Sequence, residues 1–519
     1  MLVYIHVPFC RRKCNYCTFY SQVPKDNETA TYLSSLLAEI ALWGGRLGRR
    51  QTVSSIFIGG GTPSLLPVAA IGAMLDALSK AFSLTPNLEI SLEANPHSTS
   101  GVKYFNDLLR VGVRRLSLGA QSLDDSLLKT LGRQHSSSDV IRAVRDAREA
   151  GFANINLDIM WGLPGQRLRH FKEELKYITL HLKPDHLSCY GLTLEPGTRL
   201  FEQVESGKLK LPSEKEQGHM FLDGADFLQE SGYLQYEISN FARMGFQCKH
   251  NLGYWAGRDY LGLGPGAVST WRGRRWTNSR DLAQYAAVIN GKQLPAEAED
   301  LDLATKVREL IMLSLRTTKG LNAATYRKLT GNDFFKENQN FINALHSKNL
   351  IRIRNGYLSL TRSGMLVSNT IMGHLFEALP SLTAGGPSAA ALVEQPQTER
   401  QMMAGAEART EPKPEAEAKK KFVFDPDAEL FLEIASKSLP NTDLKIEKIA
   451  PQPEAAFGVP LDFSAGALDL AANSAAATGA EVFASAKGCV DANTFQAEPS
   501  VEIKPAAEVK AGQEQGGSA

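Results

Sequence analysis

The sequence has no run of about 18 apolar residues, the length that marks a membrane-spanning helix. Its first residues, MLVYIHVPFC, lack the charged segment and apolar core of a secretory signal. Cysteine is scarce, with six in 519 residues, three of them within eight positions. A disulfide framework is not expected, because three is an odd number and reduced thiols suit an intracellular chain. These absences predict a cytoplasmic protein without a membrane span, and leave peripheral membrane association and a homodimer open.

Positive and negative charges nearly cancel over the whole chain, which has a net charge of +1, but they are unevenly distributed. Residues 381–519 hold 12 Lys and Arg against 21 Asp and Glu, whereas residues 1–380 hold 45 against 35. A basic body suits an anionic ligand such as a porphyrin propionate, and it equally suits an ordinary solvated surface. Residues 379–519 are rich in Ala, Glu, Pro and Lys, which predicts a disordered tail.

The three clustered cysteines are Cys10, Cys14 and Cys17, spaced C-x3-C-x2-C. Thiolates this close together can hold one small metal centre. An ordinary [4Fe–4S] site uses four cysteines, and no fourth follows here, so one iron would stay open for a small ligand. A structural zinc site is the alternative, but it needs four closed ligands and would have to recruit His6. The spacing favours an iron–sulfur cluster.

Short apolar runs alternate with amphipathic segments up to residue 192. The expected strands are 2–7, 55–58, 88–93, 115–118, 154–159 and 186–192. The expected helices lie near 29–43, 67–82, 100–111, 136–150 and 168–182. Such β–α repeats predict a parallel sheet with helices outside, as a partly closed barrel or a doubly wound sheet. Residues 195–300 are expected to extend this body less regularly, giving a first domain over 1–300.

Polar or glycine-rich stretches stand where the expected strands end. They are the cysteine loop, Gly59-Gly60-Gly61-Thr62-Pro63, Glu93-Ala94-Asn95-Pro96, Gly119-Ala120-Gln121-Ser122, and Asp158 before Gly162-Leu163-Pro164-Gly165. Barrel chemistry sits at the C-terminal ends of the strands, so this placement favours a barrel with a site there. Glycines let a ligand approach the backbone closely. A phosphate loop is disfavoured, because the lysine of that motif is absent.

The run YIHVPFCRRKCNYC, residues 4–17, resembles the radical S-adenosylmethionine (SAM) superfamily. It is most similar to the branch shared by oxygen-independent coproporphyrinogen III oxidase and the HemW-type haem chaperones, over about residues 2–375. The resemblance implies an α/β fold with a partial (β/α)6 TIM-like barrel. It also implies a [4Fe–4S] cluster whose open iron is chelated by the amino and carboxylate groups of SAM. The residues that match SAM contacts are Tyr4, Tyr16, Gly60, Gly61, Thr62, Glu93, Gln121, Arg133 and Asp158.

Particular roles follow from the same resemblance. The glycine run would receive the SAM amino group through its backbone, and Tyr4 would contact SAM. Tyr16 would lie beside the adenine, and Glu93 would accept hydrogen bonds from both ribose hydroxyls. Without the resemblance, Tyr4 reads as a core aromatic and Glu93 as a helix cap or ion-pair partner.

The stretch HNLGYW, residues 250–255, matches the HNxxYW signature of the haem-chaperone branch. A histidine near two aromatic rings offers an iron ligand and flat surfaces for a macrocycle. His250 is therefore a candidate haem ligand, and a structural histidine on an irregular loop is the alternative. Phe19 stands where the oxidase branch has a further cysteine. The predicted function is a haem chaperone that passes haem to an acceptor protein, with the decarboxylating oxidase as the alternative.

Residues 301–378 are expected to form a separate small module. Its first helix places apolar residues at Leu303, Val307, Leu310, Ile311 and Leu315. Further helices near 322–329 and 337–347 precede a hairpin of 350–354 and 357–361 with a two-residue turn. This pattern is winged-helix-like, and DNA binding is one interpretation. A packing role is favoured and no nucleic acid is expected, because fold does not imply function.

Overall fold

The computed structural model describes residues 1–99, 101–294 and 298–379. The predicted disordered tail falls outside the described residues from position 380 onward. Within the described ranges, none of the helices is both long and apolar enough to cross a membrane.

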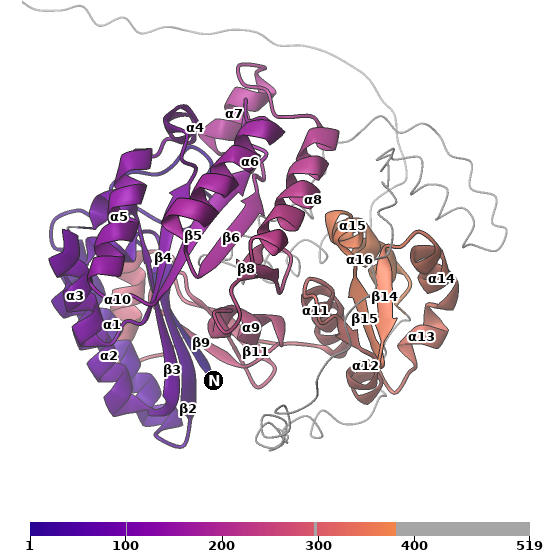
Figure 1. Ribbon diagram of the computed structural model, residues 1–519. Coiled ribbons are helices and arrows are strands. Elements are labelled where there is room, and N and C mark those ends of the chain that lie inside the picture. Colours follow the sequence, from indigo (N-terminus) through magenta and orange to yellow (C-terminus); the bar gives the residue numbers. More distant parts are fainter. Residues whose placement is uncertain (100, 295–297, 380–519) are drawn as a thin grey trace, which may run out of the picture. The chain divides into compact units, whose positions relative to one another are not determined.

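Parallel strands β1 to β6 form the centre of the sheet and follow one another in chain order (Figure 1). Their bounds are β1 Leu2–Val7, β2 Thr52–Gly60, β3 Ser83–Ala94, β4 Arg115–Gln121, β5 Asn154–Trp161 and β6 His186–Gly191. Each predicted strand is therefore confirmed. Because the order never reverses, the sheet is not doubly wound. The sheet also does not close, since β9 lies beside β1 and β8 beside β6, which confirms the partial barrel.

The helices between these strands cover the outer face of the sheet (Figure 1). They are α1 Glu28–Leu47, α2 Val68–Ala81, α3 Gly101–Val111, α4 Asp125–Leu131, α5 Ser137–Glu149 and α6 Leu168–Tyr177. Alternate residues of β1, Val3 and Ile5, are fully buried in one cluster with Leu36 and Ile40 of α1. Short helix α4 was not predicted. Its first turn is capped by Asp124, whose side chain accepts two backbone N–H groups.

The inner face of the sheet is polar, although it is buried. Alternate strand residues point to opposite faces, so one set packs under the helices and the other lines the barrel interior. The buried interior set comprises Glu89, Ser91, Glu93, Arg115, Ser117, Asn156, Asp158, His186 and Ser188. Parallel strands covered on both faces are normally apolar. The polar interior therefore marks the part of the sheet where a site is expected.

A short π-helix, Ile178–Leu182, leads into β6, and residues 192–300 extend both edges of this core. The elements after β6 are α7 Arg199–Glu205, α8 Glu214–Glu230, β7 Leu234–Gln235, β8 Asn240–Ala242, α9 Lys249–Trp255, β9 Tyr260–Leu263, β10 Val268–Trp271, β11 Arg274–Thr277, α10 Leu282–Asn290 and β12 Glu299–Asp300. Strand β9 pairs parallel to β1, and β8 pairs antiparallel to β6. Helix α9 holds the HNLGYW stretch, so His250 does not lie on an irregular loop.

The C-terminal module has its own hydrophobic cluster, which includes Val307, Ile311 and Leu315 of the predicted first helix. Its elements are α11 Leu303–Leu315, β13 Leu321–Asn322, α12 Ala323–Thr330, α13 Phe334–Glu337, α14 Gln339–Ser347, β14 Ile351–Arg354, β15 Tyr357–Leu360, α15 Arg362–Leu366 and α16 Ser368–Glu377. The predicted hairpin is confirmed, and Asn355 and Gly356 in its turn have φ of 50° and 77°, as a type I′ turn requires. The domain boundaries themselves stay predictions.

Candidate functional site at the carboxyl ends of the strands

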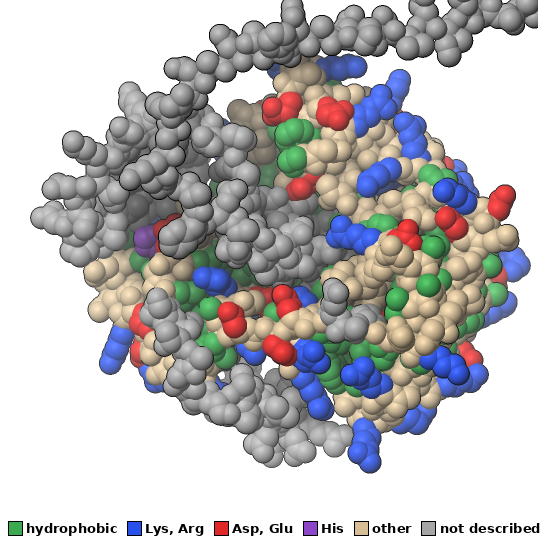
Figure 2. Space-filling model, turned by 180° about the vertical axis from the view of Figure 1, so that it is seen from behind, with side chains coloured by type: hydrophobic (Ala, Val, Ile, Leu, Met, Phe, Trp, Pro, Cys, Tyr) green, Lys and Arg blue, Asp and Glu red, His purple; other side chains and the backbone are tan. Residues whose placement is uncertain are grey.

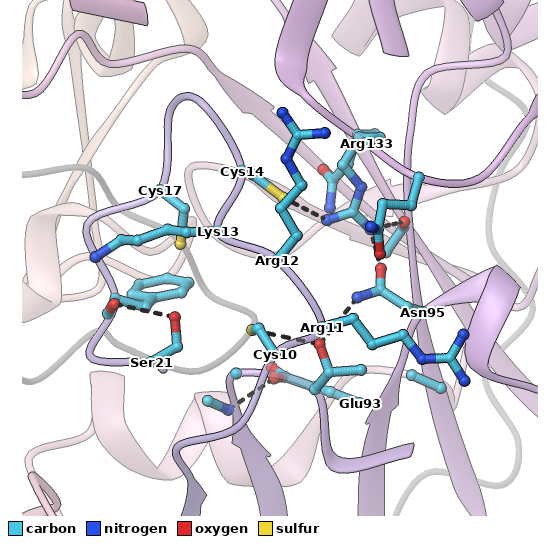
Figure 3. Close-up of a pocket in the computed structure, with 18 of the residues that line it drawn as sticks. Cys10, Arg11, Arg12, Lys13, Cys14, Cys17, Ser21, Glu93, Asn95 and Arg133 are labelled. Atoms are coloured by element: carbon cyan, nitrogen blue, oxygen red, sulfur yellow. Dashed lines mark hydrogen bonds between the residues drawn. The ribbon is translucent and has the colours of Figure 1, made fainter. Parts of the chain in front are cut away.

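A pocket lies at the carboxyl ends of β1 to β5 (Figure 3). It encloses about 850 Å³ of empty space, its open mouth included. Most of the predicted site residues line it together: Cys10, Cys14, Tyr16, Cys17, Gly60, Gly61, Thr62, Glu93, Gln121, Arg133 and Asp158. Two predicted residues, Tyr4 and His250, do not.

The three cysteines of the loop after β1 surround one space in Figure 3. Cys10 Sγ lies 3.5 Å from Thr62 Oγ1, and Arg133 Nη1 donates to Cys14 Sγ at 3.5 Å. In the part of the chain that the structure describes, none of the cysteines forms a disulfide. In that same part, no three His, Cys, Asp or Glu side chains are already drawn together as a metal site. The loop thus gathers three thiols around one pocket.

This set of donors fits an iron–sulfur cluster better than zinc. An ordinary [4Fe–4S] site uses four cysteines, so the three here leave one iron open for a small ligand. The candidate fourth zinc ligand, His6, has both ring nitrogens engaged, with the Tyr4 hydroxyl at 3.0 Å and the Tyr20 carbonyl at 2.9 Å. His6 is therefore not available as the fourth ligand of a zinc site.

The glycine run joins the cysteine loop to β3. Gly60, at φ 110°, donates its N–H to Glu93 Oε2 at 3.0 Å. A Cβ on Gly61 would lie 2.6 Å from the Phe9 carbonyl oxygen, and one on Gly59 would lie 2.9 Å from Glu93 Oε2. The run therefore allows two close approaches that any side chain would block.

We expect Gly61→Ala to push the cysteine loop away from β2, because the new Cβ would overlap the Phe9 carbonyl. Overpacking of this kind costs about 1–3 kcal/mol of unfolding free energy. The matched control is Gly45→Ala in α1, where a Cβ meets nothing within 4 Å. That control should gain up to about 1 kcal/mol from helix propensity. Denaturation and iron content after anaerobic reconstitution are the measurements, and equal values for both variants would contradict the prediction.

Gln121 and Asp158 form the inner wall of the pocket. Gln121 has φ 67° beside a register shift between β4 and β5, and its Oε1 accepts from the Tyr190 hydroxyl at 2.6 Å. A non-glycine residue in this conformation is strained, which is characteristic of functional sites. Asp158 accepts from Asn156 Nδ2 at 2.7 Å and from the Ser117 hydroxyl at 3.4 Å. Both side chains are thus fixed before any ligand binds.

Arg133 follows Gly132, the left-handed residue that ends α4. Its guanidinium donates to the Gly119 carbonyl at 2.7 Å and to Asn95 Oδ1, in addition to Cys14. One cation therefore connects the cysteine loop to the ends of β3 and β4. Asn95 was not among the predicted residues, although its position two residues after Glu93 at a strand end was a usable signal.

Tyr4 and His250 lie deeper, away from the pocket. Tyr4 is buried on the inner face of β1, where its hydroxyl meets His6. His250 is 1% exposed, its Nδ1 lies 2.9 Å from the hydroxyl of Ser55 in the first half of β2, and burial lowers its pKa to about 3. A haem ligand needs a nitrogen that the macrocycle can reach, and this one is enclosed. The role of His250 stays a prediction that would require α9 to move.

Three cations of the cysteine loop, Arg11, Arg12 and Lys13, also line the pocket and are exposed. No role was predicted for them from the sequence. On the face shown in Figure 2, Lys and Arg side chains are instead scattered among Asp and Glu. The pocket mouth is thus a place where positive charge is concentrated, which suits an anionic ligand.

A three-cysteine loop after the first strand of a partial (β/α)6 barrel is the arrangement of the radical SAM superfamily. The family model described as Radical SAM superfamily matches residues 4–178, and the one described as HemN C-terminal domain matches residues 301–367. Membership in the superfamily implies a [4Fe–4S] cluster and SAM.

Curated relatives identify the branch. Heme chaperone HemW of Bacillus subtilis (strain 168) is 34% identical over 372 residues, which cover 71% of this chain and 97% of the relative. The mitochondrial Radical S-adenosyl methionine domain-containing protein 1 of Mus musculus is 42% identical over 265 residues, 51% of this chain and 59% of the relative. The solved structure of coproporphyrinogen III oxidase (HemN) from Escherichia coli has a TM-score of 0.62 and 25% identity, covering 73% of this chain and 90% of that one. The chain belongs to the HemW family.

Proposed function

We propose that this protein is a haem chaperone, which binds haem beside a SAM-ligated [4Fe–4S] cluster and passes it to an acceptor protein. The observation that carries the proposal is the pocket itself, where three cysteines outside any disulfide, the glycine run and a cluster of cations meet. Membership in a family whose curated members are named heme chaperones supports the same function.

The residues of the pocket divide into two tasks. Cys10, Cys14 and Cys17 hold three irons of the cluster through their thiolates. The backbone of Gly60 and Gly61 and the carboxylate of Glu93 orient SAM, and Glu93 is itself positioned by the Gly60 N–H. When bound, the cluster with SAM supplies one-electron chemistry.

The side chain of Phe19 helps to distinguish the proposed chaperone from the decarboxylating oxidase. Phe19 lines the pocket at the place where the oxidase branch has a further cysteine. An apolar ring offers no thiol at this position, so the pocket lacks one group that the oxidase resemblance requires. The decarboxylating oxidase therefore stays the less favoured function, although the fold is shared with HemN.

Haem binding and porphyrinogen turnover separate the two functions. We expect the anaerobically reconstituted full chain to bind about one haem, because the proposal assigns haem to a single pocket. With reductant and SAM it should convert no coproporphyrinogen III. Turnover of about 0.01 per second or faster, against a typical enzymatic range of roughly 1–1000 per second, would overturn the proposal. Absorbance titration and product chromatography are the two measurements.

A further inference from the structure

Asp158, a predicted SAM contact on the inner wall of the pocket, lies at the end of a chain of buried hydrogen bonds. The chain runs back from the pocket through Asn156 of β5, His186 at the start of β6 and Tyr236 just after β7. The four side chains are between 0% and 6% exposed. Asn156, His186 and Tyr236 do not line the pocket, so any effect they have on a ligand there must pass through Asp158.

Asn156 makes as many hydrogen bonds as its amide allows. Its Nδ2 donates to Asp158 Oδ1 and to the Ser117 hydroxyl, each at 2.7 Å. Its Oδ1 lies 2.6 Å from His186 Nδ1 and accepts from the Ser188 hydroxyl at 3.3 Å. Both amide hydrogens and both oxygen lone pairs are therefore used. The opposite amide orientation would set a carbonyl oxygen against the Asp158 carboxylate, so the contacts fix one orientation.

The orientation of Asn156 determines which nitrogen of His186 carries the proton. Because Asn156 Oδ1 can only accept, His186 Nδ1 must donate, and Nε2 is left to accept. The Tyr236 hydroxyl lies 2.7 Å from Nε2 and donates to it. Burial, followed by the positive charge of Arg115, lowers the pKa of His186 well below its ordinary value, so the ring stays neutral. The donors therefore all point one way, from Tyr236 toward Asp158.

Packing alone does not call for such a chain. Parallel strands covered on both faces are normally apolar, and a buried polar network is favourable only when every member is satisfied. This network is satisfied, and it converges on one carboxylate, since the Ser117 hydroxyl also donates to Asp158 at 3.4 Å. Locking a ligand-binding side chain through buried hydrogen bonds behind it is what makes a site preorganised.

We propose that His186 is a positioning residue for SAM: by donating to Asn156, it holds the amide that orients the Asp158 carboxylate in the pocket. The inference rests on the proposed function, in which SAM occupies this pocket, and it names a residue outside the pocket that sets the affinity for SAM. No proton is transferred along the chain. Without the donor from His186, the Asn156 amide is free to turn, and its carbonyl oxygen then repels the carboxylate.

The test uses two substitutions of His186 that keep different halves of the imidazole, each in the full chain after anaerobic reconstitution. His186→Asn places an amide nitrogen near the position of Nδ1 and keeps the donor to Asn156, so its SAM affinity should stay within about threefold of the unaltered chain. His186→Gln reaches the position of Nε2 instead and leaves Asn156 without that donor, so it should weaken SAM binding at least about tenfold.

Equilibrium dialysis measures the SAM affinity, and the electron paramagnetic resonance spectrum of the reduced cluster shows whether SAM ligates the open iron. Iron content and denaturant unfolding show that each variant is folded. The matched control is His374→Gln, because His374 is a partly buried histidine of the C-terminal module that packs against Phe341. It should leave the SAM affinity unchanged.

A double-mutant cycle separates positioning from a merely structural role. Asp158→Ala should itself weaken SAM binding, and adding His186→Gln should then weaken it no further, whereas independent effects would add. Tyr236→Phe is the milder variant for the case that His186→Gln does not fold. It removes the donor to Nε2, so the ring proton is less firmly placed, and SAM binding should weaken about threefold.

The outcomes distinguish this inference from the function on which it rests. If the unaltered chain binds SAM and His186→Gln keeps its affinity, or if His186→Asn loses as much as His186→Gln, the inference is wrong while the proposed function stands. Additive losses in the cycle, or an unchanged affinity in Tyr236→Phe when His186→Gln does not fold, also overturn it. If the unaltered chain binds no SAM, the proposed function itself fails.

Discussion

Cys14→Ala is expected to reduce the iron bound after anaerobic reconstitution from about four per chain to nearly none. Cys14 is the middle cysteine of the loop, and its sulfur is the one that Arg133 approaches. Removing it leaves two thiols, and two thiols cannot hold a cluster that already lacks its fourth cysteine. The measurements are iron and sulfide content together with the absorbance of the cluster.

Cys189→Ala is the matched control, because Cys189 is buried among apolar residues under the outer helices and does not line the pocket. It should keep full iron content and lose only some stability. A Cys14→Ala variant that retains all its iron would contradict the cluster assignment. Stoichiometric zinc in the unaltered chain, purified without added metal, would do the same.

The strands and the pocket could be predicted from sequence because their signals are local. Each strand of the core is a short apolar run, and each is followed at once by a polar or glycine-rich stretch. Parallel strands bring such stretches to one edge, so residues as distant as Cys10 and Asp158 could be assigned to one site. The resemblance then supplied roles that the spacing alone could not.

The depth of a residue along a strand is harder to predict. Tyr4 stands three residues before Val7, the last residue of β1. Three residues along a strand correspond to roughly 10 Å, enough to keep a side chain out of a pocket at the carboxyl end. His97 also lines the pocket and was not predicted from the sequence.

Helix α9 was missed because its stabilising contacts come from far along the chain. Its first residue follows Cys248, whose side chain does not cap it. The cap is Glu89 of β3: Oε2 accepts from the Lys249 N–H and Oε1 from the His250 N–H, each at 3.0 Å. Local sequence carries no sign of a cap supplied from 160 residues away. The same holds for β9, which pairs with β1 across most of the barrel sequence.

Glu89→Ala should therefore destabilise the protein strongly. Glu89 is 8% exposed, and its charge lies near the buried guanidinium of Arg115. Removing the carboxylate leaves the N–H groups of Lys249 and His250 without an acceptor and leaves Arg115 with less compensating charge. Each buried donor left without an acceptor costs about 1–3 kcal/mol. Denaturant unfolding of the full chain measures the change in free energy.

Two companion variants make the result specific. Glu89→Gln keeps one carbonyl acceptor and should lose less than the alanine variant, because part of the cap survives. Glu149→Ala removes an exposed carboxylate at the end of α5 and should stay within about 0.5 kcal/mol of the unaltered chain. Hydrogen exchange should rise first at residues 249–255, where the cap acts. Equal stability of the Glu89→Ala and Glu149→Ala variants would show that α9 does not depend on Glu89, and its enclosure of His250 would need another cause.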